Sequence, residues 1–181
     1  MPDGARPMKA HTAAVTKVTA EKITYRWKES YAQFRHEARP LIERHWDEVG
    51  SHRDILRCDI DHDRYVFLEK SGIFHLLTAR NDAGSLIGYF GVSIIQHPRD
   101  RKAILGVDEF IYAMPEYRRC LIGPAMITRA IDYLDRLGCH IIAFREKAWR
   151  NGGGYLHRWG FEPAEMVYTK VLRAPHQDET L

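Results

Sequence analysis

Residues 115–126, Pro-Glu-Tyr-Arg-Arg-Cys-Leu-Ile-Gly-Pro-Ala-Met, join a strand-like segment to an amphipathic helix. The apolar run 110–114 ends at Pro115, two arginines follow, and the helix begins near Gly123. The start of a helix leaves backbone N–H groups without partners, and the helix dipole favours negative charge there. A strand, a basic turn and a helix start therefore predict an anion site in a chain of the α/β class, and a pyrophosphate suits such a turn.

This turn resembles the acyl-CoA-binding loop of the GNAT superfamily, the acyl-CoA-dependent N-acyltransferases. That loop reads Pro-x-Tyr-Arg-Gly-x-Gly-x-Gly-x-(Ala/Gly), and the matching positions here are Pro115, Tyr117, Arg118, Gly123 and Ala125. Arg119 replaces the glycine after the arginine, and Leu121 replaces the first glycine of the core motif. Because Leu121 has a Cβ and Pro124 lacks an N–H, we expect weaker CoA binding than a glycine-rich loop gives.

Two further segments carry the same resemblance. Residues 151–162, Asn-Gly-Gly-Gly-Tyr-Leu-His-Arg-Trp-Gly-Phe-Glu, look like the family's last motif, and residues 81–89 resemble the hairpin between its second and third strands. The three landmarks stand in the family's order and cover roughly residues 73–172. The segment before Ile73 also resembles phage-encoded or prophage-associated members of the family.

The bulk properties predict one globular domain with a sizeable core, since 45% of the 181 residues are apolar. We expect a flexible tail over 1–21, a single GNAT acyltransferase domain over 22–174 and a second tail over 175–181. The 27 basic and 24 acidic residues give a net charge of only +3 and are spread along the chain, which argues against nucleic-acid binding. Three cysteines without metal-ligand spacing, no membrane-length apolar run and no signal-peptide core indicate a cytoplasmic protein without a metal site.

Hydrophobic periodicity predicts strands over 23–27, 73–80, 86–96, 104–114, 139–144 and 166–172. It predicts helices over 31–49, 59–70, 123–137 and 151–159, with Pro40 kinking or splitting the first. This order, β-α-α-β-β-β-α-β-α-β, is that of the GNAT family. The resemblance implies a GNAT fold: a central, mixed, mostly antiparallel twisted sheet with splayed fourth and fifth strands, flanked by about four helices.

The resemblance also implies acetyl-CoA as cosubstrate, lying between the splayed strands. Backbone groups of Ile111, Ala113 and Met114 would hold its pantetheine arm. The residues that would hold its pyrophosphate are those of the turn: Arg118, Arg119, Cys120, Leu121, Ile122, Gly123 and Pro124. Asn151 is expected to cap its helix and to meet the arm.

Acetyl transfer to an amine needs a group that takes the amine's proton and one that protonates the departing thiolate. Glu109 is the candidate base, because it precedes Ile111 by two residues, where many family members keep a glutamate facing the cleft. Asp108 points to the opposite face of a regular strand, and a bulge would exchange the two roles. Tyr155 is the candidate acid, although the family's tyrosine position corresponds to Leu156. A solvated carboxylate for Glu109, a core aromatic for Tyr155 and water as the proton source stay open.

The resemblance places the acceptor groove along the first two helices and the turn before the fourth strand. The candidate lining residues are Glu43, Trp46, Asp47, His62, Asp63, Tyr65 and Glu69. Acidic and aromatic groups suit a cationic amine of a protein lysine, a polyamine or an amino sugar, whereas the basic turn 99–102 suits an acidic partner. A modified DNA base as acceptor and a homodimer are also open. Two rival hypotheses are a degenerate GNAT domain that binds CoA or a partner without catalysis, and a nucleic-acid-binding module that uses Arg118, Arg119 and 99–102.

Overall fold

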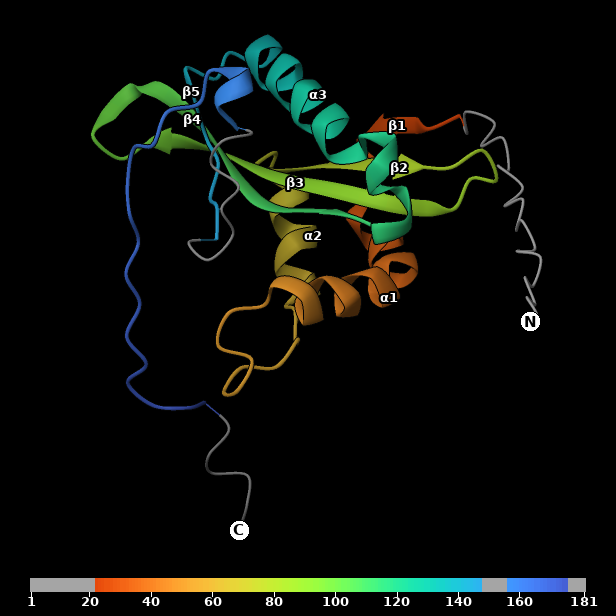
Figure 1. Cartoon of the computed structure of the whole chain (residues 1–181). Coiled ribbons are helices and arrows are strands. Elements are labelled where there is room, and N and C mark those ends of the chain that lie inside the picture. Colours follow the sequence, from red (N-terminus) through yellow and green to blue (C-terminus); the bar gives the residue numbers. More distant parts are fainter. Residues whose placement is uncertain (1–21, 148–155, 176–181) are drawn as a thin grey trace, which may run out of the picture.

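The computed structural model describes residues 22–147 and 156–175. Its central layer is a five-stranded sheet with the strand order β1-β2-β3-β4-β5 (Figure 1). The strands are β1 (Thr24–Trp27), β2 (Phe74–Arg80), β3 (Leu86–His97), β4 (Asp100–Ala113) and β5 (Ile141–Ala143). Neighbouring strands from β1 to β4 are antiparallel, and β5 runs parallel to β4. This is the mixed, mostly antiparallel sheet that the sequence predicted.

Helices cover both faces of the sheet (Figure 1). On one face lies α3 (Ile122–Arg136), and on the other lie α1 (Tyr31–Val49) and α2 (His62–Lys70). A short 3-10 helix, η1 (Pro115–Cys120), follows β4. A second one, η2 (His157–Trp159), precedes the C-terminal segment. α3 buries Met126, Ala130 and Leu134, whose spacing of about one helical turn gives a continuous apolar stripe.

The first helix, α1, is fixed to α2 at its N-terminus. Its buried side chains share one face: Tyr31, Phe34, Ala38 and Leu41. α1 continues through Pro40 as one helix, so the proline does not split it. Ser30 provides no side-chain cap. Instead, the Glu69 carboxylate of α2 accepts hydrogen bonds from the Tyr31 N–H at 2.9 and 3.0 Å.

A β-bulge in β4 sets the direction of the candidate base. Gly91 pairs with Phe110 and Val92 pairs with Asp108, so Glu109 is an extra residue in β4. A Cβ on Gly91 would come within 2.5 Å of the Phe110 ring, so only glycine fits beneath that ring. Asp108 shares the α3 side of the sheet with its partner Val92. Glu109 lines a cavity with residues of α2, so it lies on the opposite side.

The fourth and fifth strands separate after a short contact. β5 pairs with β4 only from Leu105 to Val107, and β4 then continues to Ala113 without a partner on that edge among the described residues. At the point of separation, the Asp108 carboxylate accepts hydrogen bonds from Arg145, from the backbone N–H at 2.8 Å and from Nε at 3.3 Å. The predicted splay is therefore present, and it leaves the backbone edge of β4 open.

The prediction of a closing strand over 166–172 is wrong. These residues form no strand and run outside the body of the domain (Figure 1). Their apolar side chains are exposed, with Met166 at 79% and Tyr168 at 84%. The β-branched and aromatic residues of this segment favour an extended chain, but a strand also needs a neighbouring edge to pair with.

Two neighbouring predictions also change. β5 is shorter than the predicted 139–144, and Ile141 in it is 48% exposed. Most of the predicted helix over 151–159 lies outside the described residues, and its end at 157–159 is the 3-10 helix η2.

Candidate active site

The turn between η1 and α3 has the backbone shape of a glycine-containing loop. Leu121, the residue between the two elements, has φ 56° and ψ 31°, which is the left-handed region that glycine favours. Its side chain is 65% exposed, so no packing offsets the strain of about 1–2 kcal/mol. The absence of glycine therefore does not prevent a positive φ here. The N–H of Leu121 donates to the Arg118 carbonyl at 3.1 Å and is not available to a phosphate.

Two amides at the start of α3 remain available for an anion. The bond from the Ala125 N–H to the Leu121 carbonyl, 3.0 Å long, closes the first turn. Ile122 and Gly123 precede that bond, and Pro124 has no N–H. A Cβ on Gly123 would meet no atom within 4 Å, so the space before the helix is open. Two free amides and the helix dipole fit one phosphate group.

The two arginines of η1 differ in what they contact. Arg118 donates from Nε to the Ala113 carbonyl at 3.0 Å and forms an ion pair with Glu48 of α1. It therefore ties the turn to α1. Arg119 is exposed and has no ion-pair partner within 22–147 and 156–175, and Cys120 beside it is also exposed. Arg119 is thus the arginine whose charge is available to a phosphate.

The predicted contacts to the pantetheine arm fall into two groups. The Met114 N–H donates to the Ile87 carbonyl at 2.9 Å, and the Met114 carbonyl accepts from Tyr117 at 2.9 Å. Both backbone groups of Met114 are therefore bonded within the protein. Because backbone groups alternate between the two edges of a strand, those of Ile111 and Ala113 face the open edge of β4. The Ala113 carbonyl accepts from Nε of Arg118 at 3.0 Å, so the Ala113 N–H and both backbone groups of Ile111 can receive an extended ligand there.

The Glu109 carboxylate is held by two neighbours. Ser93 donates from Oγ to Oε1 at 2.6 Å, and Nη2 of Arg145 lies 3.7 Å from Oε2. The side chain keeps 28% exposure. Glu109 lines a cavity of about 330 Å³ between α2 and β4. The other residues that line this cavity are Ile60, Asp61, Arg64, Tyr65 and Leu68. Glu109 is thus a fixed carboxylate that a small molecule can reach.

Asp108 is placed differently. Its side chain is buried, and burial raises the pKa of its carboxyl group, against the lowering effect of the Arg145 hydrogen bonds and charge. It does not line the cavity that Glu109 lines. The bulge therefore does not exchange the two roles, because Glu109 faces the cavity and Asp108 fixes the segment after β5.

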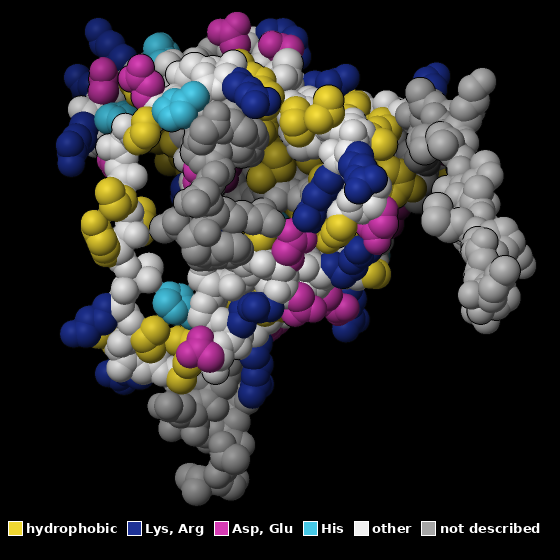
Figure 2. All heavy atoms as spheres, in the orientation of Figure 1, with side chains coloured by type: hydrophobic (Ala, Val, Ile, Leu, Met, Phe, Trp, Pro, Cys, Tyr) yellow, Lys and Arg dark blue, Asp and Glu magenta, His cyan; other side chains and the backbone are white. Residues whose placement is uncertain are grey.

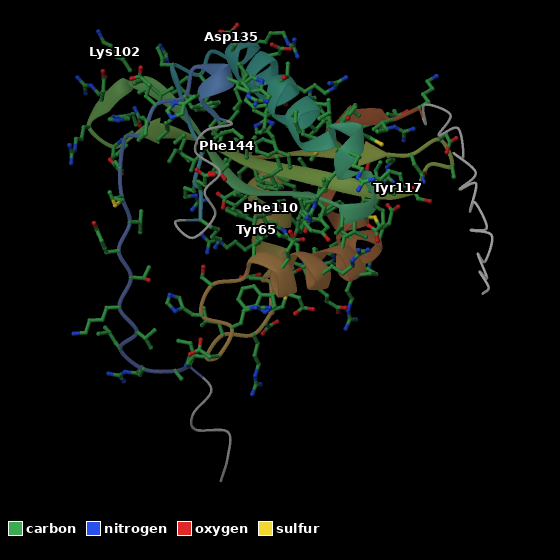
Figure 3. All side chains as sticks on the ribbon, in the orientation of Figure 1. Tyr65, Lys102, Phe110, Tyr117, Asp135 and Phe144 are labelled. Atoms are coloured by element: carbon green, nitrogen blue, oxygen red, sulfur yellow. The ribbon has the colours of Figure 1, made fainter. Side chains whose placement is uncertain are left out.

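Tyr65 is the predicted acceptor-groove residue that lines this cavity. Its ring packs edge-on to Phe110, with centroids 5.8 Å apart, and the two labelled rings lie together below β4 (Figure 3). Burial raises the pKa of the Tyr65 hydroxyl, and the charge of Glu109 raises it further. Tyr65 and Glu109 thus line the same cavity and interact through charge.

Other predicted groove residues serve the packing of α1 against α2. Nδ1 of His62 lies 3.0 Å from the Tyr31 hydroxyl, and Asp63 forms an ion pair with Arg35 at 3.1 Å. Glu69 caps α1, as described above. These three side chains are bonded within the protein and do not line the cavity.

The remaining predicted site residues, Tyr155 and Asn151, lie outside the described residues. Within the described part, no group of three or more His, Cys, Asp and Glu side chains is arranged to hold a metal ion. No helix there combines the length and the apolar character needed to cross a membrane.

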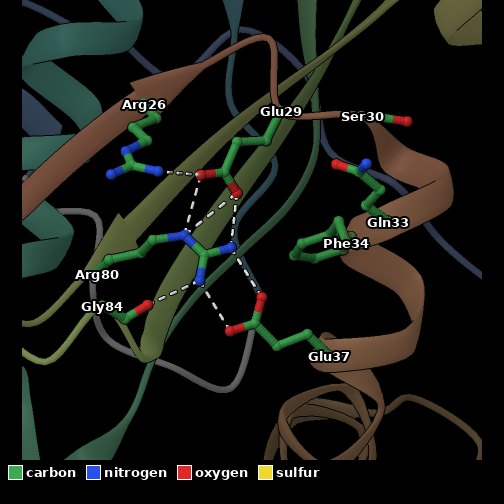
Figure 4. Close-up of a pocket in the computed structure, with 8 residues that line it drawn as sticks. All are labelled: Arg26, Glu29, Ser30, Gln33, Phe34, Glu37, Arg80 and Gly84. Atoms are coloured by element: carbon green, nitrogen blue, oxygen red, sulfur yellow. Dashed lines mark hydrogen bonds and ion pairs between the residues drawn. The ribbon is translucent and has the colours of Figure 1, made fainter.

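A second cavity, of about 360 Å³, lies near the start of α1 (Figure 4). At its centre Arg80 donates to Glu29 at 2.7 Å, to Glu37 at 2.8 Å and to the Gly84 carbonyl at 2.9 Å. Because all of its terminal nitrogens are bonded, Arg80 clamps the β2–β3 turn to α1 and is not available to a ligand.

A family model described as "Acetyltransferase (GNAT) family" matches residues 24–161, from β1 to just beyond η2. The chain belongs to the GNAT acetyltransferase family. The match includes the open edge of β4, the turn at Leu121 and the cavity at Glu109. GNAT enzymes use acetyl-CoA and act on amine acceptors. No curated protein matched this GNAT chain.

Solved structures agree with this fold. A predicted acetyltransferase from Clostridium acetobutylicum with acetyl-CoA has a TM-score of 0.66 at 14% identity, over 83% of this chain and 97% of that chain. Glucosamine-6-phosphate N-acetyltransferase from Arabidopsis thaliana has a TM-score of 0.65 at 13% identity, over 84% and 100%. An acetyltransferase from Trypanosoma brucei has a TM-score of 0.63 at 14% identity, over 83% and 100%. At these identities the likeness is one of fold.

Sequence reasoning missed three side chains of this GNAT site: Ser93, Arg145 and Arg64. Ser93 has no motif around it, and its role depends on the bulge register. Arg145 reaches Glu109 because β4 and β5 separate where they do. The position of Arg64 near the start of the helix predicted over 59–70, which was expected to line the acceptor groove, was the one signal available from the sequence.

Proposed function

We propose that this protein is an N-acetyltransferase that moves an acetyl group from acetyl-CoA to a primary amine by direct attack in a ternary complex. The observation that carries the proposal is the placement of Glu109. It is held at a β-bulge, faces a cavity, and lies two residues from the open backbone edge at Ile111. A proton acceptor and a backbone donor thus stand on one short stretch of strand.

The residues fit the parts of acetyl-CoA that they would hold. The amides of Ile122 and Gly123, with the Arg119 side chain, would bind the pyrophosphate. The open edge at Ile111 and Ala113 would pair with the pantetheine arm. Acetyl-CoA supplies an activated acetyl thioester when bound.

The chain's own groups would then handle the proton and the developing charge. Glu109 accepts the proton that the amine loses as it attacks, directly or through a water molecule. The Ile111 N–H donates to the acetyl oxygen as negative charge develops on it. Tyr155 stays the proposed source of the proton for the thiolate.

The rival hypothesis of nucleic-acid binding has less support. The basic turn 99–102 and the arginines of η1 lie at opposite ends of β4, whose 14 residues span on the order of 40 Å. Basic and acidic side chains are interspersed on the face in Figure 2. Arg118 is also neutralised by Glu48. These features do not make one continuous basic surface.

The test is acetyl-CoA turnover with a panel of primary amines, followed by free-thiol release and by mass spectrometry of the acetylated amine. We expect amine-dependent thiol release that matches product formation. Thermal stabilisation by CoA without turnover of any amine would instead favour the degenerate, non-catalytic domain. Salt-sensitive DNA binding without either response would favour the nucleic-acid hypothesis.

A further inference from the structure

The cavity at Glu109 contains charges of both signs. Asp61 and Glu109 line it as carboxylates, and Arg64 lines it as a guanidinium. A second guanidinium, that of Arg145, reaches the Glu109 carboxylate at 3.7 Å. A site built for a polycation would not place two arginines beside its proton acceptor, because like charges repel the ligand.

The two arginines are not equivalent. Arg145 is bound to Asp108 and Glu109 and is therefore part of the framework. The Arg64 side chain has no hydrogen bond or ion pair within the described ranges. Its backbone N–H is the group that the α2 cap, Asp61, binds at 2.9 Å. The guanidinium of Arg64 is thus an unpaired cation at the wall of the cavity.

The charges that surround the Tyr65 hydroxyl support this arrangement. Burial raises the pKa of Tyr65, Glu109 raises it as well, and Arg64 and Arg145 lower it. The carboxylate and both guanidinium groups therefore act on the pKa of the same phenol. The cavity, of about 330 Å³, is at the small end of ligand sites, and this size suits a compact molecule that carries both the amine and the anion.

We propose that the acceptor is a small primary amine that carries a carboxylate or a phosphate close to the amine, and that Arg64 binds this anionic group. The inference rests on the proposed transferase function. The amine approaches Glu109, while the anionic group pairs with the guanidinium of Arg64 on the α2 side. Planar guanidinium groups bind both carboxylates and phosphates through paired hydrogen bonds.

The experiment compares matched amines that differ in the anion. β-Alanine is compared with β-alaninamide for the carboxylate, and O-phosphoethanolamine with ethanolamine for the phosphate. Rates are expressed per free base to remove differences in amine protonation. We expect the anionic member of at least one pair to have a kcat/KM about tenfold higher, and the pair that responds identifies the anion.

The variant Arg64→Gln should abolish that preference, so that kcat/KM values for the anionic and the neutral member of the pair come within about twofold of each other. The control Lys70→Gln removes the same charge from the end of α2, away from the cavity, and should keep the preference. Turnover without preference, or a preference that survives Arg64→Gln, overturns the inference while the transferase function stands. Absence of turnover with all four amines and with the wider panel overturns both.

Discussion

Ser93 of β3 donates a hydrogen bond across 2.6 Å to the Glu109 carboxylate at the bulge of β4. Ser93 is 6% exposed, whereas the Glu109 side chain is 28% exposed. The buried hydroxyl therefore holds one oxygen of the carboxylate from the sheet, and the rest of the group stays accessible. A neighbouring strand, and not the β4 backbone alone, orients the proposed base. This makes Ser93 a positioning residue.

The variant Ser93→Ala should lower kcat about tenfold, because a hydrogen bond to a charged group is lost and the carboxylate is free to rotate. The dissociation constant for acetyl-CoA should stay unchanged, since Ser93 is not part of the turn at Leu121. Steady-state kinetics and calorimetric titration measure the two quantities. Ser93→Thr keeps the hydroxyl and should restore most of kcat. A fall in melting temperature with unchanged kcat would show that the hydroxyl only supports the fold.

The variant Glu109→Gln should reduce kcat at neutral pH by a factor of about 100 or more, because an amide cannot accept the proton. Binding of acetyl-CoA should persist, since its proposed contacts lie on the β4 edge and at the start of α3. Single-turnover kinetics with saturating acetyl-CoA measure the effect. Asp132→Asn, on the exposed side of α3, is the matched control and should have no effect. Nearly full turnover in Glu109→Gln would remove this residue from the mechanism.

Apart from the 3-10 helix η1, the elements from β1 to α3 follow from local pattern. Apolar spacing in α1 and α3 and short apolar runs in β2 and β3 are properties of neighbouring residues, and they indicate helix or strand directly. The motif around Tyr117 and Gly123 predicted where an anion would bind, and this position stays a prediction. The direction of Glu109 was also predicted, although for a regular strand.

What the sequence did not predict depends on contacts between distant segments. The bulge at Glu109 depends on how β3 and β4 align. Gly91, which lies at the register shift, is the one residue in the sequence that hints at it. The pairing of Arg118 with Glu48 joins positions 70 residues apart. The failure at 166–172 has the same cause, since residue types that favour strands identify a chain that can pair but not the edge with which it pairs.

The variant Leu121→Gly tests the strain at the turn. Glycine adopts φ 56° without a Cβ clash, but it also gives the unfolded chain more freedom, so the two effects nearly cancel. We expect a free energy of unfolding within about 1 kcal/mol of the wild type, and above that of Leu121→Ala, which keeps the Cβ. Urea unfolding measures it. Affinity for acetyl-CoA should stay within about threefold, since the backbone already has the required shape. A large loss of affinity would mean that the leucine side chain contacts the ligand.

Replacing Arg118 and replacing Arg119 in η1 should have different effects on cofactor affinity and on stability. Arg119→Gln should raise the dissociation constant for acetyl-CoA about fivefold to tenfold and weaken its salt dependence, because an unpaired cation is lost. Arg118→Gln should mainly lower the melting temperature, because it removes the bonds to Glu48 and Ala113. Calorimetric titration at two salt concentrations, with thermal unfolding, distinguishes them. Equal effects on affinity would contradict this division.

The hydrogen bonds from Arg80 to Glu29 and Glu37 should make the free energy of unfolding depend on pH in the acidic range. The hydrogen bond from Arg80 lowers the pKa of Glu37 below its ordinary value of 4.5, so near that pH the folded state binds fewer protons than the unfolded state. The stabilisation is complete above pH 4.5 and is lost as the pH falls through the lower pKa of the folded state.

Glu37→Gln cannot titrate, so the stability difference between wild type and variant should shrink between about pH 6 and about pH 3. Its size should be at most about 1 kcal/mol, because the Glu37 side chain is 43% exposed and water screens the pair. Urea unfolding at several pH values measures it. Glu43→Gln removes an exposed partner of Arg39 on the same helix and should change little at any pH. If the stability difference stays constant down to pH 3, the Glu37 side chain stabilises the fold through packing and hydrogen bonding and not through its charge.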